Sequence, residues 1–296
     1  MLVLLRMTVG WHILYEGIWK YQQQDFSADG YLSMASGPFA DYFRDEVVED
    51  FTGLKHLDEK WNLDQLQAYH DRFVSQLKLD DAAKAAAARH LEERKQNIKD
   101  FLAEKTNAML FGDYAVQWEG LKKQKQELAR SGGGTSFQVQ RIWEAEQKLR
   151  GEGRPWVKWI DEQHAGLGED LDYLLPRERR GETPQPTVKE IFTNPNLFVT
   201  YSSIAIGICM IAGFFTRLAS LGGGIFLLMI VAAKWQWPGY YAPPAHPAQG
   251  HSLYVTKEFI EMMCCFTLAT LPTGRWAGFD YFLHGLLVRP FMRNKD

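Results

Sequence analysis

The sequence predicts an all-α protein: a four-helix transmembrane bundle with an inserted extracytoplasmic domain of helical hairpins. Residues 197–238 predict the bundle, because they hold two apolar arms that meet at Arg217. Each arm has about twenty residues, enough for a helix to cross a hydrocarbon core of about 30 Å. The charged, Ala-rich middle predicts the inserted domain, because its apolar residues recur at helical spacing. We therefore expect a first transmembrane helix at 1–20, a soluble helical insert at 21–194, and three further transmembrane helices with a basic tail at 195–296.

The averaged composition of the 296 residues conceals this division. A net charge of −3 and a mean hydropathy of −0.29 are typical of a soluble protein, yet the apolar residues gather at the two ends of the chain. The near-neutral charge gives no sign of nucleic-acid binding. All three cysteines, Cys209, Cys264 and Cys265, lie in apolar segments. The polar middle therefore cannot build a disulfide framework or a cysteine zinc site, and we predict no metal site.

The first apolar segment, residues 1–19, is expected to be a retained transmembrane helix. A cleaved signal peptide is the alternative, but Arg6, His12 and Glu16 interrupt the apolar run and no clear cleavage site follows it. His12, Glu16 and Lys20 are spaced four residues apart, so they share one face of the helix.

The insert is expected to begin with irregular or short elements at 27–50, whose aromatic side chains can pack against a neighbour. Helix signals then become strong. An amphipathic stripe predicts a helix over 59–77, and high helix propensity predicts one over 81–111. A candidate break follows at 112–113.

Glycines divide the second half of the insert. The chain is expected to reverse at 131–136, and the next helix, 137–150, is expected to end at the glycines of 151–153. A linker composition follows at 177–186. Together these helices predict antiparallel hairpins with a small core of their own.

Charge asymmetry predicts the orientation. The turn at Arg217 and the tail after residue 272 carry cationic residues, whereas the loop 235–251 has neither Lys nor Arg. Because cationic segments tend to stay in the cytoplasm, both termini are expected there, with residues 21–194 on the extracytoplasmic side. The chain is thus predicted to be a multi-pass protein of the cytoplasmic (inner) membrane, with the lipid bilayer as a partner.

Ionisable residues in the apolar segments are the candidate functional groups. In the fourth apolar segment, 252–271, one helix face carries Tyr254, Glu258, Glu261 and Cys265. Helical rise places Glu261 about 13 Å below the outer surface. His12 and Glu16 lie in the outer half of the first helix, and Lys234 ends the third.

Charges at such depths are costly, so these groups are expected to face the bundle interior and to pair. Two interpretations remain open. One is an outward-facing polar pocket that binds a substrate or a quinone headgroup, or relays protons. Its catalytic candidates are His12, Glu16, Glu258 and Glu261, and its cofactor-binding candidates are Lys234 and Tyr254. The other is a set of buried ion pairs that only fixes the helix register.

Three groups of residues also form a recognisable pattern. The first helix, the turn between helices two and three, and the segment after helix four supply them: Arg6, Gly10, His12, Glu16, Gly17 and Lys20; Gly213, Thr216, Arg217, Leu218 and Ala219; Pro272, Gly274, Arg275, Trp276 and Asp280. In these positions the chain resembles the DoxX family of integral membrane proteins, which includes the small subunit of thiosulfate:quinone oxidoreductase. The resemblance implies a small membrane subunit of a redox system tied to quinones and to sulfur or thiol chemistry. Ordinary short members of that family lack an insert such as 21–194.

The leading hypothesis is a membrane subunit of a quinone-linked redox complex, with a quinone as cofactor and a second protein subunit as partner. The alternative is a non-catalytic scaffold or sensor that recruits a partner through the insert. A third is a small-molecule transporter that uses the polar pocket. The sequence names neither the substrate nor the partner, and it leaves a homo-oligomer open.

Overall fold

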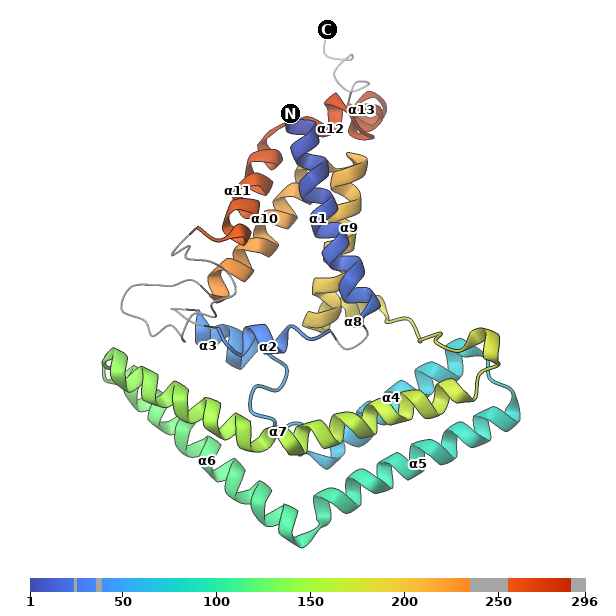
Figure 1. The fold of residues 1–296 in the computed structure, drawn as a ribbon, viewed down its shortest axis with the longest axis vertical. Coiled ribbons are helices and arrows are strands. Elements are labelled where there is room, and N and C mark those ends of the chain that lie inside the picture. Colours follow the sequence, from blue (N-terminus) through green and yellow to red (C-terminus); the bar gives the residue numbers. More distant parts are fainter. Residues whose placement is uncertain (24–25, 36–38, 235–254, 289–296) are drawn as a thin grey trace. The chain divides into compact units, whose positions relative to one another are not determined.

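The computed structural model describes residues 1–23, 26–35, 39–234 and 255–288, and all the regular structure in these ranges is helical (Figure 1). The predicted all-α class is therefore confirmed. Contacts divide the chain into two compact units, one of residues 1–49 with 187–296 and the other of residues 50–186. Each unit has a hydrophobic core of its own.

Four helices form the body of the first unit: α1 (Leu2–Gln22), α9 (Pro195–Ala212), α10 (Thr216–Ala233) and α11 (Lys257–Thr270). α1 packs along α9, and α10 packs along α11 (Figure 1). Short helical elements flank them: α2 (Asp29–Leu32), α3 (Ala40–Tyr42), η1 (Phe43–Val47), α8 (Val188–Thr193), α12 (Thr273–Trp276), α13 (Asp280–Leu283) and η4 (His284–Val288). The first three confirm the short elements predicted in 27–50.

Local chemistry fixes the ends of α9. Asn194 caps its start, because the side-chain Oδ1 accepts the backbone N–H groups of Asn196 and Leu197, and Pro195 occupies the first helical position. The helix ends at Gly213, whose φ of +67° is a left-handed conformation that favours glycine. The chain can therefore turn sharply into α10.

Close backbone contact holds α1 against α9. A Cβ added to Gly207 of α9 would lie 2.6 Å from the backbone N and Cα of Leu14, and one added to Gly10 of α1 would lie 2.8 Å from the Cβ of Met210. Gly17 is packed just as tightly against Ile204. Small residues that bring two backbones together are the usual interface of membrane helices.

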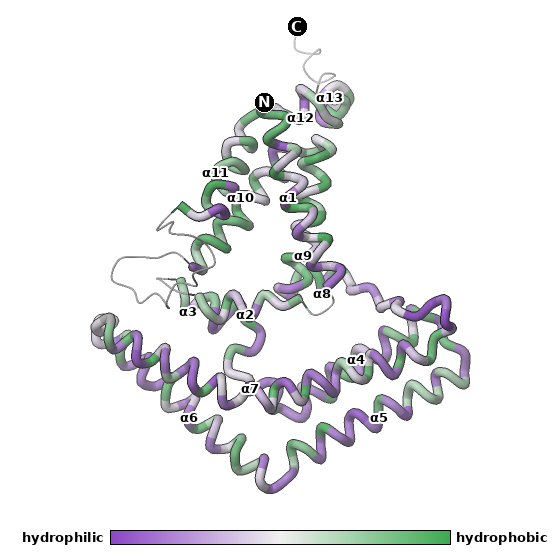
Figure 2. The backbone as a smooth tube through the Cα atoms, in the orientation of Figure 1, coloured by the Kyte–Doolittle hydropathy of each residue, from purple (hydrophilic) through white to green (hydrophobic). Residues whose placement is uncertain are grey.

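The first unit exposes apolar side chains in addition to burying them. The buried side of α1 holds Arg6, Val9, Gly10, Ile13 and Gly17, and its exposed side is an apolar stripe of Leu4, Met7, Trp11, Tyr15 and Ile18. α10 shows a similar exposed stripe of Leu218, Leu221, Ile225, Leu228 and Met229. Figure 2 shows the apolar character of these helices as green along much of their length.

Among the described residues, two helices are long and apolar enough to cross a membrane: α9 and α10. Arg6, His12 and Glu16 lower the hydropathy of α1, and α11 has only 14 residues in the described part of the chain. The structure is therefore compatible with a membrane protein through two helices, and the predicted set of four spans is not shown by length and composition alone.

The second unit consists of four long helices, α4 (Glu59–Leu77), α5 (Asp81–Ala103), α6 (Lys105–Arg130) and α7 (Ser136–Tyr173), followed by the short η2 (Arg177–Arg179). α7 contacts α6 along one part of its length and α5 along another. Apolar side chains fill the core between α4, α5 and α7, among them Leu66, Phe73, Leu91, Ile98, Ile160, Leu167 and Leu171. Charged residues cover the outside (Figure 2).

Three helix boundaries predicted in the insert are wrong. The candidate break at 112–113 is absent, because α6 continues from Lys105 to Arg130. The glycines of 151–153 do not end a helix, since α7 continues through them and through Pro155. Gly153 instead packs against the Tyr114 ring, where a side chain would collide with it. The helix predicted over 81–111 ends at Ala103, because Glu104 leaves the helical conformation with a ψ of 127°. The side-chain amide of Asn107 donates to the freed carbonyl of Phe101 at 2.9 Å.

Candidate functional site

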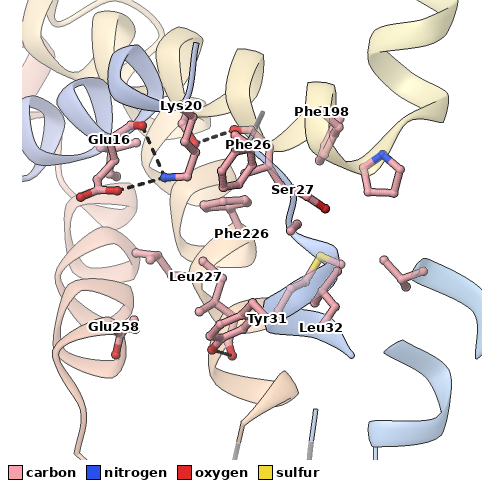
Figure 3. Close-up of a pocket in the computed structure, with 18 of the residues that line it drawn as sticks. Glu16, Lys20, Phe26, Ser27, Tyr31, Leu32, Phe198, Phe226, Leu227 and Glu258 are labelled. Carbon is pink, nitrogen blue, oxygen red and sulfur yellow. Dashed lines mark hydrogen bonds and ion pairs between the residues drawn. The ribbon is translucent and has the colours of Figure 1, made fainter. Parts of the chain in front are cut away.

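A cavity of about 400 Å³ lies in the first unit (Figure 3). α1, α9, α10 and α11 supply most of its wall, and residues from 26–47 supply the rest. One part of the wall is ionisable and comes from α1 and α11: His12, Glu16, Lys20, Lys257, Glu258 and Glu261. The rest is mainly apolar and includes the aromatic rings of Phe26, Tyr31, Phe43, Phe198 and Phe226. A mostly apolar pocket with a few convergent polar groups is the usual form of a small-molecule site.

His12 and Glu261 join the two ionisable helices. His12 Nδ1 lies 2.9 Å from Glu261 Oε1, and both residues line the cavity. Because Nδ1 is occupied by Glu261, Nε2 is the ring nitrogen left for a ligand. The pair also fixes the tautomer of a neutral His12, because a hydrogen bond to one ring nitrogen determines the role of the other.

Glu16 and Lys20 form a second pair on the same face of α1. Lys20 Nζ donates to Glu16 Oε2 at 3.0 Å, as Figure 3 shows. The Lys20 ammonium also lies 5.4 Å from the centre of the Phe26 ring, within the range of a cation–π contact. Glu258 lines the cavity from α11, so the structure brings His12, Glu16, Glu258 and Glu261 to one cavity.

The two predicted cofactor-binding residues have different outcomes. Lys234 does not line the cavity; its ammonium lies 4.1 Å from the centre of the Tyr31 ring, and Tyr31 does line it. Tyr254 lies outside the described residues. Sequence reasoning therefore missed Tyr31 and Lys257 as wall residues, although the aromatic content of 27–50 was a usable signal for Tyr31.

Tyr31 is tied to α10 through its hydroxyl group. Its hydroxyl donates to the carbonyl of Ile230 at 3.0 Å. Burial raises the pKa of the phenol, and the nearby Glu258 carboxylate raises it further. Tyr31 therefore stays protonated at neutral pH and remains a hydrogen-bond donor.

The residues that resemble the DoxX family meet mainly at the other end of the bundle. Buried Arg6 donates to the carbonyl oxygens of Thr273 at 3.0 Å and Ala277 at 2.8 Å. The Asp280 carboxylate accepts the backbone N–H groups of Phe215 and Thr216 at 2.7 and 2.9 Å. These contacts tie α1 and the α9–α10 turn to the segment after α11. Of the pattern, only His12, Glu16 and Lys20 line the cavity.

The second unit contains a separate ionic cluster around His56. Its Nδ1 lies 2.8 Å from Asp50 Oδ2, and its Nε2 lies 3.3 Å from Asp161 Oδ1. Burial alone would lower the pKa of His56, but hydrogen bonds to Asp161 and Asp50 outweigh it and raise the pKa to about 9. Nearby His164 lacks such a pair, and burial lowers its pKa to about 4. The charged His56 side chain therefore holds the 50–58 loop against α7 through ion pairs.

In the described part of the chain, no three His, Cys, Asp or Glu side chains are placed to hold a metal ion. No family model, curated protein or solved structure matches the chain. The function therefore has to be inferred from the chemistry of the cavity and from the surface that surrounds it.

Proposed function

We propose that this chain is a multi-pass protein of the cytoplasmic (inner) membrane and a DoxX-like subunit of a quinone-linked redox complex. α1, α9, α10 and α11 are its four spans. Both termini lie in the cytoplasm and residues 21–194 lie on the extracytoplasmic side. The complex would act on sulfur or thiol compounds, with a partner subunit that delivers the electrons.

The exposed apolar stripes support the four spans. On α1 the stripe from Leu4 to Ile18 repeats every three or four residues, which is one continuous face of a helix. An apolar face of this length in water would be an aggregation hazard, whereas in lipid it is the expected outer surface. The polar and small residues of α1 face inward, as in helices that associate within a membrane.

The observation that carries the function is the His12–Glu261 pair at the edge of an aromatic cavity. A quinone is a planar, uncharged ring whose carbonyl oxygens accept hydrogen bonds. When bound it supplies reversible chemistry that takes up two electrons and two protons. The described wall fits such a ring. In its imidazolium form, which keeps Nδ1–H on Glu261, His12 would donate from Nε2–H to one carbonyl oxygen, and Phe226 and Phe198 would contact the ring and the apolar tail.

The carboxylates give the site a way to handle protons. Glu261 contacts His12 directly, and Glu16 and Glu258 line the same cavity. Proton transfer needs groups within hydrogen-bond reach or one water apart, and these residues extend along α1 and α11. His12 and Glu261 would therefore hold and release protons, while the ammonium groups of Lys20 and Lys257 balance the charge of the carboxylates.

Binding of a short-tailed quinone to the purified chain tests this proposal. His12→Ala and Glu261→Gln should each weaken binding by about tenfold, because each removes a hydrogen bond that involves a charged group. His284→Ala is the matched control, since His284 lies in η4 and does not line the cavity. Native mass spectrometry of the protein extracted with its own lipids should show a bound quinone or a redox partner.

The same variants separate the other two hypotheses. A transporter would lose flux in His12→Ala and Glu261→Gln without binding a quinone. A scaffold would be indifferent to both and would respond to changes on the surface of the second unit, for example at the exposed Met109 and Val116 of α6. Equal quinone binding by all variants, or no binding by the unaltered chain, would contradict the redox proposal.

A further inference from the structure

A short segment outside the four long helices closes one side of the cavity. We name residues 26–35 the cover. Five of its residues line the cavity: Phe26, Ser27, Ala28, Tyr31 and Leu32. In Figure 3 Phe26 and Tyr31 of the cover and Phe226 of α10 point into the same space. The cover therefore contributes two of the aromatic surfaces that any ligand would meet.

Polar contacts fasten the cover to three different helices. The backbone N–H of Ala28 donates to Asn196 Oδ1 of α9 at 2.7 Å. The Tyr31 hydroxyl donates to the Ile230 carbonyl of α10 at 3.0 Å, and Lys234 lies against the other part of the same ring. Lys20 of α1 lies over Phe26. A single neutral hydrogen bond shifts an equilibrium only about fivefold, and a cation–π contact contributes a similar amount, so each of these contacts is individually easy to release.

Apolar packing fixes only the end of the cover. Ala35 is fully buried with Ala40, Phe43 and Ala233 in a small cluster, against which Tyr31 and Leu32 pack. By contrast, the beginning of the cover is half-buried, with Phe26 and Ala28 contacting other elements through the polar contacts above. A segment with one packed end and one polar-bonded end can open without disrupting the bundle core.

We infer that the cover is the gate of the cavity and that Tyr31 is the residue that holds it closed. Tyr31 carries out this role because its hydroxyl donates to the Ile230 carbonyl of α10 and its ring lies against the Lys234 ammonium, in addition to its packing against the small apolar cluster. The aromatic side chains of the cover also select the ligand: they favour a planar, uncharged ring over a flexible chain or a hydrated ion. The nature of the ligand rests on the proposed function, whereas the gate does not.

Lys234 acquires a different role in this arrangement. It was a cofactor-binding candidate, but its ammonium contacts the Tyr31 ring. It is therefore a positioning residue, which acts on the ligand through Tyr31. The prediction is that Lys234→Gln changes access to the cavity in the same direction as Tyr31→Phe, and to a smaller extent.

The gate can be tested without any ligand. Ser203 is buried and lines the cavity from α9, so Ser203→Cys places a reporter thiol inside it. Its reaction with a water-soluble maleimide measures opening, with the unaltered chain giving the background of the native cysteines. Tyr31→Phe keeps the ring and removes the hydroxyl, so the reaction should become about fivefold faster. Val199→Cys, which also lines the cavity, is a second reporter if the first variant does not fold.

Tyr42→Phe is the matched control, because Tyr42 is exposed on α3 and does not line the cavity. In the chain that carries the reporter cysteine, Tyr42→Phe should leave the labelling rate unchanged. Equal rates for Tyr31→Phe and the unaltered chain with either reporter would overturn the gate.

A quinone added before the maleimide separates the gate from the proposed function. Protection of the reporter thiol, with faster loss of protection in Tyr31→Phe, supports both. Faster labelling in Tyr31→Phe without any protection supports the gate and contradicts quinone binding. Protection with no effect of Tyr31→Phe supports quinone binding and overturns the gate.

Discussion

The two units of this chain solve the same folding problem in opposite ways. In α4 of the second unit, Leu66 and Phe73 are buried and charged residues face outward. In α1 of the first unit, Arg6 is buried and Trp11 is exposed. Both helices bury one face against neighbours, so the difference lies in what surrounds them. The proposed membrane location of the first unit accounts for the difference, because lipid favours an apolar outer surface whereas water favours a charged one.

The two cores also differ in what holds them together. The second unit packs large side chains, for example the stacked rings of Phe101 and Trp159, whose centres are 4.1 Å apart. The first unit relies on missing side chains, at Gly10, Gly17 and Gly207, which let two helices touch. Burial of apolar surface away from water stabilises the core of the second unit. If the first unit lies in lipid, as proposed, close van der Waals contact between its helices takes that part, because lipid is as apolar as the helix surface.

The largest expected effect comes from placing one charge on each outer surface. Ile225 is exposed at the centre of α10, and Val116 is exposed on α6. Ile225→Lys should destabilise a membrane-embedded first unit by about 3 kcal/mol, because a lysine at the centre of a span must leave water. Val116→Lys should change stability by less than about 0.5 kcal/mol, as expected for a surface in water.

The yield of protein integrated into the membrane and its thermal unfolding in bilayer nanodiscs measure the stability of both variants. If Ile225→Lys is as harmless as Val116→Lys, the exposed stripe of α10 faces water and the comparison between the two units fails.

A smaller effect tests the close packing of α1 against α9. Gly207→Ala adds a single Cβ that would lie 2.6 Å from the backbone of Leu14. Because the neighbour is backbone and cannot rotate away, the helices must separate, at a cost of about 2 kcal/mol. In Gly222→Ala the nearest atom would be 3.8 Å away, so that variant should be neutral. Thermal unfolding of the two variants in the same lipid compares them directly, and equal melting temperatures would refute close packing as the source of stability.

The helices α9 and α10 of the first unit could be predicted because a long apolar run is a local feature of the sequence. The apolar runs of α9 and α10 can be read without knowing any contact. The shared face of His12 and Glu16 follows from helical spacing, and the expected pairing is present between His12 and Glu261. Residue spacing could not predict that α1 and α11 meet, because their meeting depends on close contacts among α1, α9, α10 and α11.

The errors arise where a distant contact decides the local structure. The glycines near Gly153 looked like a helix stop, but Tyr114 occupies the space that a side chain there would fill. The cover was predicted only as irregular structure or short elements with no stated partner, and the hydrogen bond from Tyr31 to Ile230 joins residues 199 positions apart. A glycine or a tyrosine has several structural uses, and only the fold selects among them.

The smallest predicted effect on stability comes from His56 in the second unit. His56 is charged and held between Asp50 and Asp161, an arrangement that suits a unit in water. Its pKa of about 9 in the folded chain exceeds its ordinary value of 6.5, so the charged form stabilises the fold. The contribution is complete below pH 6.5 and is lost as the pH rises through 9. Because Asp161 is largely exposed, it should amount to about 1–2 kcal/mol.

Thermal unfolding of the full chain between pH 6 and pH 10 measures the contribution of charged His56 to the free energy of unfolding. The difference in stability between the unaltered chain and His56→Gln should be largest near pH 6 and should shrink towards pH 10. His164→Gln is the control: burial keeps the pKa of His164 near 4, so its imidazole is neutral throughout this range and its contribution should not vary. A difference for His56→Gln that stays constant up to pH 10 would mean that the loop is held by packing, and that the second unit does not depend on this charge.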